Sequence, residues 1–460
     1  MTQGADAGQA LADAAIVPAR QTPLYDEVLA WVTERLAPVG LPKPLGKRLA
    51  VAMCGLVMSN KATTGEVSSA VAALEISQAK EESVARRLQR SLRDTRLDPS
   101  LLPAVFGGVL PELLADHVRA HATNSGTPEK QHERFVGVVV VVDESSQEDE
   151  VHLLVGGVPV GGVVLPLAVR TWEQNAAMAP GEYWTQLMGL LLDIQQMLPP
   201  QLREHVLLTA DRAYGVPRML DVLGALDWNW LLRVQGQTQV RLPDGRCCPL
   251  RQLVPKPGRQ WSSGFGHGSA TEREASSPMD VFKGAGWRRS QVVAVWPEGQ
   301  QEPWLLVTSL PAKLQRVQEY AQRWAIERLF LAWKSHGWDI EASGVHDPQR
   351  LGRWLTVIAL ATLWRLAMAL PVALERLADL AARVGKGARQ LRLPGISAPP
   401  RPWAAKFSLL TLGAQVAHRA SRLTGTPALC WRLPFWEGRT WDQTCRHVYL
   451  TATRQFSISP

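Results

Sequence analysis

A stretch near residue 330 carries four side chains at a spacing that could support phosphate chemistry. These are Tyr320, Arg323, Glu327 and Lys334, in a run without glycine or proline that favours a helix. At about 100° per residue, the four side chains project within about 60° of one another. One carboxylate therefore shares a narrow stripe with two cations and a phenol. The stripe borders the apolar face of the helix, so we expect it to be half-buried at a cleft.

Two interpretations of this stripe are open. Arg323 and Glu327 could form an exposed pair one helical turn apart, which contributes only a few tenths of a kcal/mol. Alternatively, Glu327 holds a metal ion while Tyr320, Arg323 and Lys334 grip a phosphate backbone. The rest of the chain has to decide between these two interpretations.

Two aspartates follow runs that read as core strands. The first run, 135–142, is β-branched and typical of a strand buried on both faces, and it ends at Asp143. The second run begins at residue 204 and ends at Asp211. Because α/β sheets place their sites at the carboxyl ends of strands, we expect both aspartates at one edge. Either one alone could be a turn cap, and only the joint pattern indicates a site.

Three separate carboxylates, Asp143, Asp211 and Glu327, could meet at that edge. Clustered carboxylates repel one another unless a cation compensates them. Hard oxygen ligands with open positions suit Mg²⁺ or Mn²⁺. Two such ions about 4 Å apart can activate a water or hydroxyl and stabilise the leaving oxygen of a phosphodiester.

The elements that would position these residues form a mixed α/β pattern. Their order is three strands, helix, strand, helix and strand. We expect the strands near 135–142, 151–155, 163–171, 204–211 and 228–234, and the helices over 182–198 and up to residue 226. Gly156, Gly157, Gly161 and Gly162 are interpreted as hairpin turns.

A β-rich stretch then interrupts the core. It covers 235–303 as short β-like pieces and includes a Gly/Ser-rich segment, 255–278, that we expect to be mobile. One further strand follows at 304–310. Pro311 is expected to start the helix that carries the four phosphate-chemistry residues.

The chain before residue 123 reads as a run of helices. Thr63 and Glu66 form a possible capping box for one of them. The helix expected over 78–93 places Arg86, Arg90 and Arg93 on one stripe. This stripe is either a solvated charged face or a surface laid against DNA, with the arginines at phosphates or base edges. We interpret 121–132 as a linker.

Composition narrows the class of protein. The 460 residues carry a net charge of +8, which suits a polyanionic partner without proving one. The five cysteines show no metal-ligand spacing, which argues for a reducing compartment and against structural zinc. The N-terminus lacks the features of a signal peptide. The most apolar window, 354–374, contains Arg365 and Pro371, so a buried helix is expected there and not a membrane span.

The motifs as a set resemble those of bacterial insertion-sequence transposases of the DDE class, the cut-and-paste group with hairpin intermediates. Tyr320-x2-Arg323-x3-Glu327-x6-Lys334 is similar to their Tyr–Arg–Glu–Lys signature. The segment 209–215, Thr-Ala-Asp-Arg-Ala-Tyr-Gly, resembles the motif around their second aspartate, and 141–146 that around their first. The strand that starts at Trp304 looks like the one that carries a base-stacking tryptophan. The resemblance covers 135–370.

This resemblance implies a fold, a reaction and partners. The fold would be a ribonuclease-H-like mixed-sheet catalytic core interrupted by a β-rich insertion and flanked by helical N- and C-terminal regions. Asp143, Asp211 and Glu327 would bind two Mg²⁺ or Mn²⁺ ions. Trp304 would stack on a displaced base, although a core role is equally open for it. Eight residues would contact DNA, including Arg212 directly after the second aspartate. They are Tyr320, Arg323, Lys334, Trp304, Arg212, Arg86, Arg90 and Arg93.

The implied reaction begins with nicking at a transposon end. The freed 3′-hydroxyl attacks the opposite strand to form a hairpin, the hairpin opens, and the end is transferred into target DNA. The implied partners are double-stranded DNA, as terminal inverted repeats and target, and a second copy of the chain in a synaptic homodimer. No membrane is implied, and the expected location is the bacterial cytoplasm, on the nucleoid.

The sequence also departs from the family pattern. Asp143 is followed by Glu144, Ser145 and Ser146, whereas a small residue and then threonine are expected. Leu331 stands where some relatives have a further basic residue. Two alternatives therefore stay open: a metal-dependent DNA nuclease without strand transfer, and a catalytically inert DNA-binding protein.

We expect six segments along the chain, which differ in their pattern. These are a disordered leader, a helical DNA-end-binding domain, a first core part, the β-rich insertion, a second core part, and a helical C-terminal region suited to dimerisation. Their expected bounds are 1–23, 24–125, 133–234, 235–303, 304–375 and 376–460.

Overall fold

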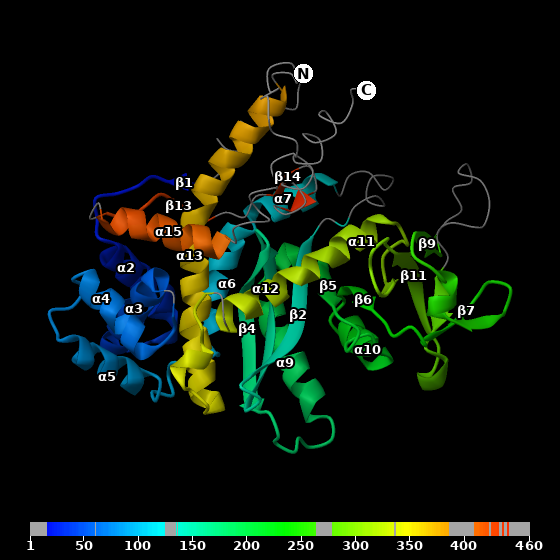
Figure 1. The fold of residues 1–460 in the computed structure, drawn as a ribbon, viewed down its shortest axis with the longest axis horizontal. Helices are drawn as coiled ribbons and strands as arrows, with labels where there is room; N and C mark the ends of the chain where they lie inside the picture. Colours follow the sequence, from blue (N-terminus) through cyan, green and yellow to red (C-terminus); the bar gives the residue numbers. More distant parts are fainter. Residues whose placement is uncertain are drawn as a thin grey trace. The chain divides into compact units, whose positions relative to one another are not determined.

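The computed structural model describes most of the chain in two compact units (Figure 1). The described residues are 16–59, 61–124, 135, 137–263, 278–334, 337–385, 409–422, 425–431, 435–436 and 439–440. The first unit takes the described residues of 1–120, 144–199 and 327–460, and the second unit those of 121–143 and 200–326. The expected leader and most of the region after residue 385 lie outside the described residues.

The first unit is built around helix α13, Pro348–Gly385. Helices α3 and α15 and strand β4 pack against it. By length and composition its part from Pro348 to Ala373 could cross a membrane, but 89% of its most apolar window is buried inside the protein. The expected buried helix is therefore present, and it continues through Pro371. The other helices of this unit, α7 and α12 only in part, are α2 (Leu24–Leu36), α3 (Lys43–Met58), α4 (Thr64–Ala73), α5 (Glu81–Ser91), α6 (Leu101–Leu113), α7 (Ala115–Asn124), α9 (Glu182–Met197), α12 (Trp324–Lys334) and α15 (Leu409–Arg422).

Local signals explain the helix starts. The Thr63 hydroxyl accepts a hydrogen bond from the backbone N–H of Glu66 at 3.1 Å, so the expected cap of α4 is confirmed. Helix α7 extends to Asn124, which makes the interpretation of 121–124 as linker wrong. The remainder of that expected linker, 125–132, lies outside the described residues.

The C-terminal end of α3 is closed by side chains from far along the chain. The last carbonyls of a helix have no partner within it. Arg365 donates to the carbonyls of Leu56, Val57 and Ser59, at 2.9, 3.1 and 2.5 Å. The indole N–H of Trp338 also donates to Leu56, and the Arg365 guanidinium lies 4.4 Å from the Trp338 ring centroid. The expected buried helix thus carries a buried cation because that cation caps another helix.

Strands β3 (Val151–Val160) and β4 (Val163–Glu173) form an antiparallel hairpin in the first unit. Gly161 and Gly162 form its turn with positive φ angles of 57° and 82°. Gly156 and Gly157 were expected in a turn as well, but they lie inside β3, where the register with β4 shifts. Helices α9 and α13 pack against β4, which accounts for the near-complete burial of both strands.

The second unit contains the parallel strands. The order of its main strands is β2-β5-β6-β12-β11, with β2 parallel to β5, β5 parallel to β6, and the last two antiparallel to their neighbours. Their bounds are β2 Val138–Gln147, of which the residues to Asp143 belong here, β5 Val206–Ala210, β6 Asn229–Arg233, β11 Arg288–Trp296 and β12 Trp304–Thr308. The observed order along the chain matches the mixed α/β pattern expected from the sequence, with α10 (Pro217–Ala225) between β5 and β6.

Short strands form the β-rich insertion, as expected. They are β7 (Gln239–Arg241), β8 (Cys247–Pro249), β9 (Arg259–Ser262) and β10 (Met279–Val281). Strands β9 and β10 pair with β11, and β7 pairs with β10 and β8. Within the segment expected to be mobile, residues 264–277 lie outside the described residues.

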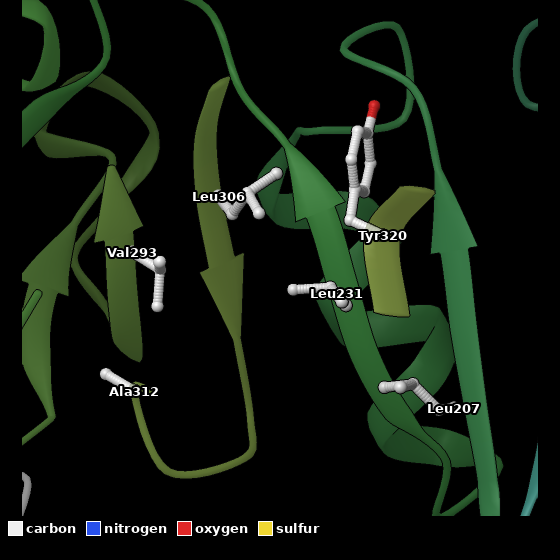
Figure 2. Packing of buried hydrophobic residues seen from close by; sticks show 6 residues of the cluster. All are labelled: Leu207, Leu231, Val293, Leu306, Ala312 and Tyr320. Atoms are coloured by element: carbon white, nitrogen blue, oxygen red, sulfur yellow. The ribbon is translucent and has the colours of Figure 1, made fainter. Parts of the chain in front are cut away.

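The core of the second unit joins this sheet to helix α11, Gln315–Tyr320. Figure 2 shows Leu207, Leu231, Val293 and Leu306 from four strands, together with Ala312 and Tyr320. Trp304 is half-buried and packs against this cluster. Pro311 does not start the helix as expected, because α11 begins four residues later. The expected single helix is also divided, since a 3₁₀ turn at Ala321–Arg323 separates α11 from α12.

Candidate functional site

Three charged residues stand at the same level on three neighbouring strands. Val141 of β2 lies opposite Thr209 of β5, and Ala210 of β5 lies opposite Leu232 of β6. Continued by one or two residues, this register brings Asp143, Asp211 and Arg233 into one row at the carboxyl ends of parallel strands. That edge is where open α/β sheets hold their sites. The sequence singled out both aspartates but missed Arg233, whose only signal is its position at the end of β6.

Asp143 does not end its strand as expected. Strand β2 continues to Gln147 and leads through a short turn, with the backbone N–H of Glu150 bonded to the Gln147 carbonyl, into β3. The sequence suggested an end at Asp143 because the β-branched run stops there. The hairpin supplies the pairing that extends the strand past that point.

Asp143 is paired with a cation of the signature motif. Arg323 Nη1 donates to Asp143 Oδ2 at 3.0 Å. The Arg323 side chain is 6% exposed, and its guanidinium lies 5.9 Å from the Tyr320 ring and 5.0 Å from the Trp324 ring. The expected half-buried stripe is thus fully buried at Tyr320 and Arg323. Two aromatic faces and a carboxylate fix this guanidinium beside the sheet edge.

Asp211 takes part in a tight turn directly after β5. Its Oδ1 accepts a hydrogen bond from the N–H of Ala213 at 2.8 Å. The turn-cap role considered from the sequence is therefore real, and it orients the carboxylate. Gly215 closes the turn against β6, where an added Cβ would meet the Arg233 carbonyl oxygen at 2.1 Å. The glycine of the 209–215 motif is required by this close approach.

Tyr320 is a buried phenol surrounded by the charges of the site. Burial is the main reason that its pKa is raised to about 12, while the charges of Arg323 and Arg233 lower it and that of Asp211 raises it. The phenol therefore stays protonated at neutral pH. Its ring meets Trp304 edge to face, with centroids 5.4 Å apart. The half-buried Trp304 is thus a support for Tyr320 in this structure.

Arg212 and Arg233 share one carboxylate oxygen. Glu302 Oε2 accepts from Arg212 Nη1 at 3.1 Å and from Arg233 Nη2 at 3.0 Å. Two guanidinium groups that converge on one acidic oxygen form a geometry suited to a phosphate. Arg212 and Glu302 are about half exposed, whereas Arg233 is mostly buried.

Glu327 and Lys334 lie on α12 and belong to the first unit. Glu327 is one helical turn after Arg323, and both Glu327 and Lys334 are half-buried. Leu331 on the same helix is exposed, as is Trp324 at its start, with 48% and 42% of their surfaces accessible. Sequence reasoning missed Trp324, although an exposed tryptophan next to the signature arginine could have signalled a contact surface.

The Glu144 side chain has contacts of its own and does not share those of Asp143. Successive side chains of a strand point to opposite faces, so Glu144 and Asp143 diverge. The Glu144 carboxylate accepts from the Tyr183 hydroxyl and lies 2.9 Å from His152 Nε2. Both partners belong to the first unit, where His152 also stacks on Trp172 at 4.4 Å. The departure from the family pattern after Asp143 thus supplies a contact between β2, β3 and α9.

The acidic residues differ in how readily they could serve as metal ligands. Among the described residues, no three Asp, Glu, His or Cys side chains are grouped as a metal site. Asp143 and Asp211 nevertheless bring hard carboxylate oxygens to adjacent positions of one sheet edge, the ligand type that Mg²⁺ and Mn²⁺ prefer. These two side chains therefore fit divalent ions, with Arg323 compensating the charge of Asp143.

Part of the chain is similar to a known protein family. Residues 170–364 match the family model described as the transposase DDE domain, a range that includes Asp211 and Glu327 and begins after Asp143. No curated protein matches the chain. A solved structure, the piggyBac transposase synaptic complex with hairpin DNA, is similar with a TM-score of 0.33 and 10% identity, over 86% of this chain and 83% of that one. Residues 170–364 of this chain are therefore similar to the DDE domain of transposases, a family that normally uses divalent metal ions.

Proposed function

We propose that the chain is a cut-and-paste DNA transposase of the Tyr–Arg–Glu–Lys group. The observation that carries the proposal is the row of Asp143 and Asp211 across parallel strands, with Arg323 of the signature motif bonded to Asp143. Glu327, one turn after Arg323, completes the acidic set in this proposal. An exposed Arg323–Glu327 pair with no other role would leave the buried Asp143–Arg323 contact unexplained.

In this proposal Asp143, Asp211 and Glu327 would hold two Mg²⁺ or Mn²⁺ ions, and the chemistry that such ions would supply is activation of the attacking oxygen and stabilisation of the leaving oxygen. A water oxygen attacks phosphorus at the transposon end, the bond from phosphorus to the 3′ oxygen breaks, and a 3′-hydroxyl is released. That hydroxyl then attacks the opposite strand and forms a hairpin as a second oxygen leaves. Arg323, Lys334 and Tyr320 hold phosphates beside the reacting strand.

The test uses a plasmid that carries the DNA flanking the gene on both sides. Asp143→Ala, Asp211→Ala and Glu327→Ala should each abolish Mg²⁺-dependent cleavage while DNA binding in a chelator is retained. Asp221→Ala is the matched control, because Asp221 pairs with Arg288 on the surface of the second unit. Cleavage at the wild-type rate by any of the three variants would remove that residue from the site.

Strand transfer is measured separately with pre-cut ends. Joining of these ends to a target plasmid distinguishes a transposase from a nuclease that only cleaves. The same gels report hairpins, and Trp304→Ala should reduce hairpin formation more than first-strand nicking. Equal loss of both steps would assign Trp304 to the support of Tyr320 alone. The proposed synaptic homodimer is checked by the mass of the complex formed with two end fragments.

The proposed role of each segment follows the domain bounds expected from the sequence. In it the helices up to residue 125 bind transposon ends, 133–234 and 304–375 form the catalytic core around the β-rich insertion, and the region from 376 contributes to dimerisation. Arg86, Arg90, Arg93 and Arg212 contact DNA in this proposal. Each phosphate contact that is lost should lower the salt slope of binding by about one.

A further inference from the structure

Helix α5 in the first unit presents a sharply divided surface. Val84 and Leu88 are buried against the neighbouring helices, whereas Arg86, Gln89 and Arg90 are exposed. At about 100° per residue, the three exposed side chains lie within about 100° of one another on the side opposite Leu88. We call Arg86, Gln89 and Arg90 the outer face of α5. It combines two guanidinium groups with an amide, which are groups that form paired hydrogen bonds.

A second helix holds α5 in place. Helix α4 precedes it after seven connecting residues, 74–80, and α3 packs against both (Figure 1). Gln89 Nε2 lies 3.5 Å from the Thr64 hydroxyl at the start of α4, and the Ser69 hydroxyl donates to Glu81 at the start of α5. The connection is longer than in a compact helix-turn-helix. As in a helix-turn-helix motif, however, one helix packs against a second helix and leaves the polar face of that second helix exposed.

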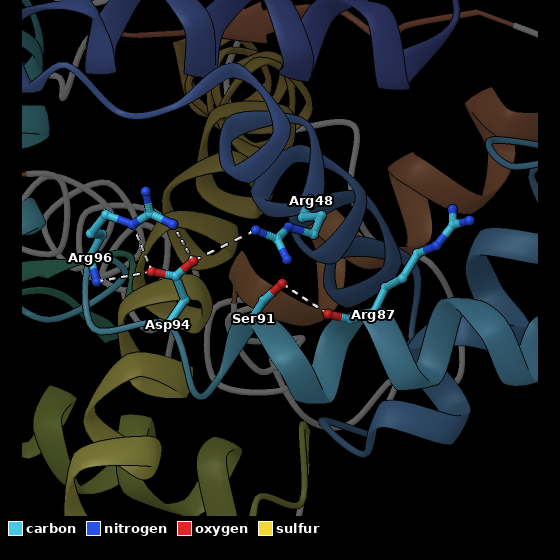
Figure 3. Close-up of polar contacts among 5 residues, drawn as sticks. All are labelled: Arg48, Arg87, Ser91, Asp94 and Arg96. Carbon is cyan, nitrogen blue, oxygen red and sulfur yellow. Dashed lines mark hydrogen bonds and ion pairs between the residues drawn. The ribbon is translucent and has the colours of Figure 1, made fainter.

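The chain after α5 is tied down by a carboxylate. Asp94 accepts hydrogen bonds from Arg96, with Nε at 2.9 Å, and lies 3.6 Å from Arg48 of α3. Figure 3 draws these contacts. The hydrogen bonds from Arg96 lower the pKa of Asp94. Asp94 is thereby a positioning residue that anchors the end of α5 to α3. Arg87 and Arg93, both exposed, flank the outer face near this anchored end.

Charge favours the C-terminal half of α5 as the contact surface. The acidic residues of the helix, Glu81 and Glu82, lie in its first turn, and Glu82 is 3.9 Å from Arg86. Arg87 and Arg90 follow toward its end, and Arg93 lies two residues beyond the last residue of α5. The side chains that would approach a polyanion are thus cationic, on a helix held rigidly by α3 and α4. Arginines alone would be enough to bind an isolated anion. The exposed Gln89 between Arg86 and Arg90 adds an amide, which can hydrogen-bond to the edge of a base.

We propose that α5 enters the major groove of duplex DNA and reads its sequence through the outer face. Arginine pairs with the O6 and N7 atoms of guanine and glutamine with N6 and N7 of adenine, each in a bidentate manner. Arg87 and Arg93 contact phosphates on either side. The inference rests on the proposed function, in which the helices before residue 125 bind transposon ends, and it adds which side chains choose the sequence.

The experiment selects binding sites from a pool of randomised duplex DNA with the full chain in EDTA. Wild-type protein should enrich a defined sequence. Arg86→Ala, Gln89→Ala and Arg90→Ala should each lose about 5- to 150-fold in affinity for it and enrich a pool that is relaxed at one position, which corresponds to about 1–3 kcal/mol per bidentate contact. Arg87→Ala should instead weaken all sequences equally. Arg20→Ala, an exposed arginine outside α5, is the control.

Two results would overturn the proposal. The first is selection of an unchanged sequence by all three variants of the outer face, with melting temperatures like that of the wild type. The second is wild-type binding to anionic lipid vesicles or heparin with no preference for duplex DNA. Because EDTA removes divalent ions, the outcome is independent of cleavage. If the selection enriches a sequence but the plasmid is not cleaved, the proposed catalysis is rejected. The proposal that α5 reads the DNA sequence is then retained.

Discussion

At the scale of single residues, the site depends on how each charge is compensated. Arg323 is buried between two aromatic rings and bonded to Asp143, so the arginine sets the position of a candidate ligand. An uncompensated carboxylate at this edge would repel its neighbour Asp211 and the DNA phosphates. The signature arginine therefore has a structural role in addition to any contact with phosphate.

Replacing this arginine tests that role. Arg323→Gln keeps a donor but removes the charge, and it should lower the rate of Mg²⁺-dependent cleavage by about 100-fold, the scale of losing one preorganised electrostatic group. Single-turnover cleavage of the plasmid substrate measures the rate. Arg328→Gln, an exposed position of α12, is the control. A change in DNA affinity without a change in rate would place Arg323 in binding only.

Glu302 accepts hydrogen bonds from two arginines, Arg212 and Arg233, that could otherwise bind a phosphate. Glu302→Gln removes its charge while keeping its shape, so DNA should compete better for Arg212 and Arg233. Because the pair of Arg212 with Glu302 is exposed, the gain is modest, about two- to fivefold in affinity at low salt. Fluorescence anisotropy with a labelled duplex measures it. An affinity that falls on this substitution would mean that Glu302 orients the arginines for binding.

At the scale of elements, the turn after β5 has little freedom. Gly215→Ala places a methyl group 2.1 Å from the Arg233 carbonyl oxygen, which must move β6 or the turn. We expect a loss of about 1–3 kcal/mol in the free energy of unfolding, together with a larger loss of cleavage because Asp211 sits in the same turn. Urea unfolding and plasmid cleavage measure the two effects. Gly224→Ala in α10, where an added Cβ meets nothing within 4 Å, is the control.

The end of α3 depends largely on one distant cation. Arg365→Leu removes a donor to three backbone carbonyls, of which that of Leu56 keeps a second donor, the Trp338 indole, and we expect about 2–4 kcal/mol of destabilisation, since leaving buried acceptors unsatisfied costs their desolvation. Thermal unfolding measures the change. Arg350→Leu, exposed in the first turn of the same helix α13, serves for comparison. Equal stability of the two variants would show that the carbonyls find other partners.

Elements whose signals are local were predictable from the sequence. The β-branched run of β2, the strand ending at Asp211 and the cap at Thr63 all depend on adjacent residues. What the sequence did not indicate depends on residues far apart in the chain. The continuation of β2 past Asp143 requires β3, the partners of Glu144 lie on β3 and α9, and Arg233 acquires its place only from the register with β5. Pro311 misled, since α11 begins only at Gln315, whereas the helix expected around Pro371 is present.

At the scale of the whole molecule, the chain passes between the two units next to candidate residues. One passage lies directly after Asp143 and another directly before Glu327. Glu327 belongs to the first unit, whereas Asp143, Asp211, Tyr320 and Arg323 belong to the second. Register and contacts therefore support the pair of aspartates, and Glu327 is assigned to the proposed acidic set by its place in the signature motif.

Whole-molecule stability should also depend on pH through a buried histidine. His117 in α7 is buried, and loss of solvation lowers its pKa from 6.5 to about 3. The unfolded chain takes up this proton near pH 6.5, whereas the folded chain resists it until about pH 3. The contribution of His117 to the free energy of unfolding is therefore largest above pH 6.5. It falls as the pH drops from about 6.5 to about 3, by roughly 3–5 kcal/mol in total.

His117→Leu removes this group at nearly constant volume. Its unfolding free energy, measured by urea titration between pH 7 and pH 4, should fall less steeply than that of the wild type, even if the variant differs in stability at pH 7. His418→Leu, at an exposed position of α15, is the control for replacing a histidine by leucine. Identical slopes for wild type and His117→Leu would mean that His117 gains its proton without leaving the fold, and the acid sensitivity would then belong to the carboxylates paired with arginine.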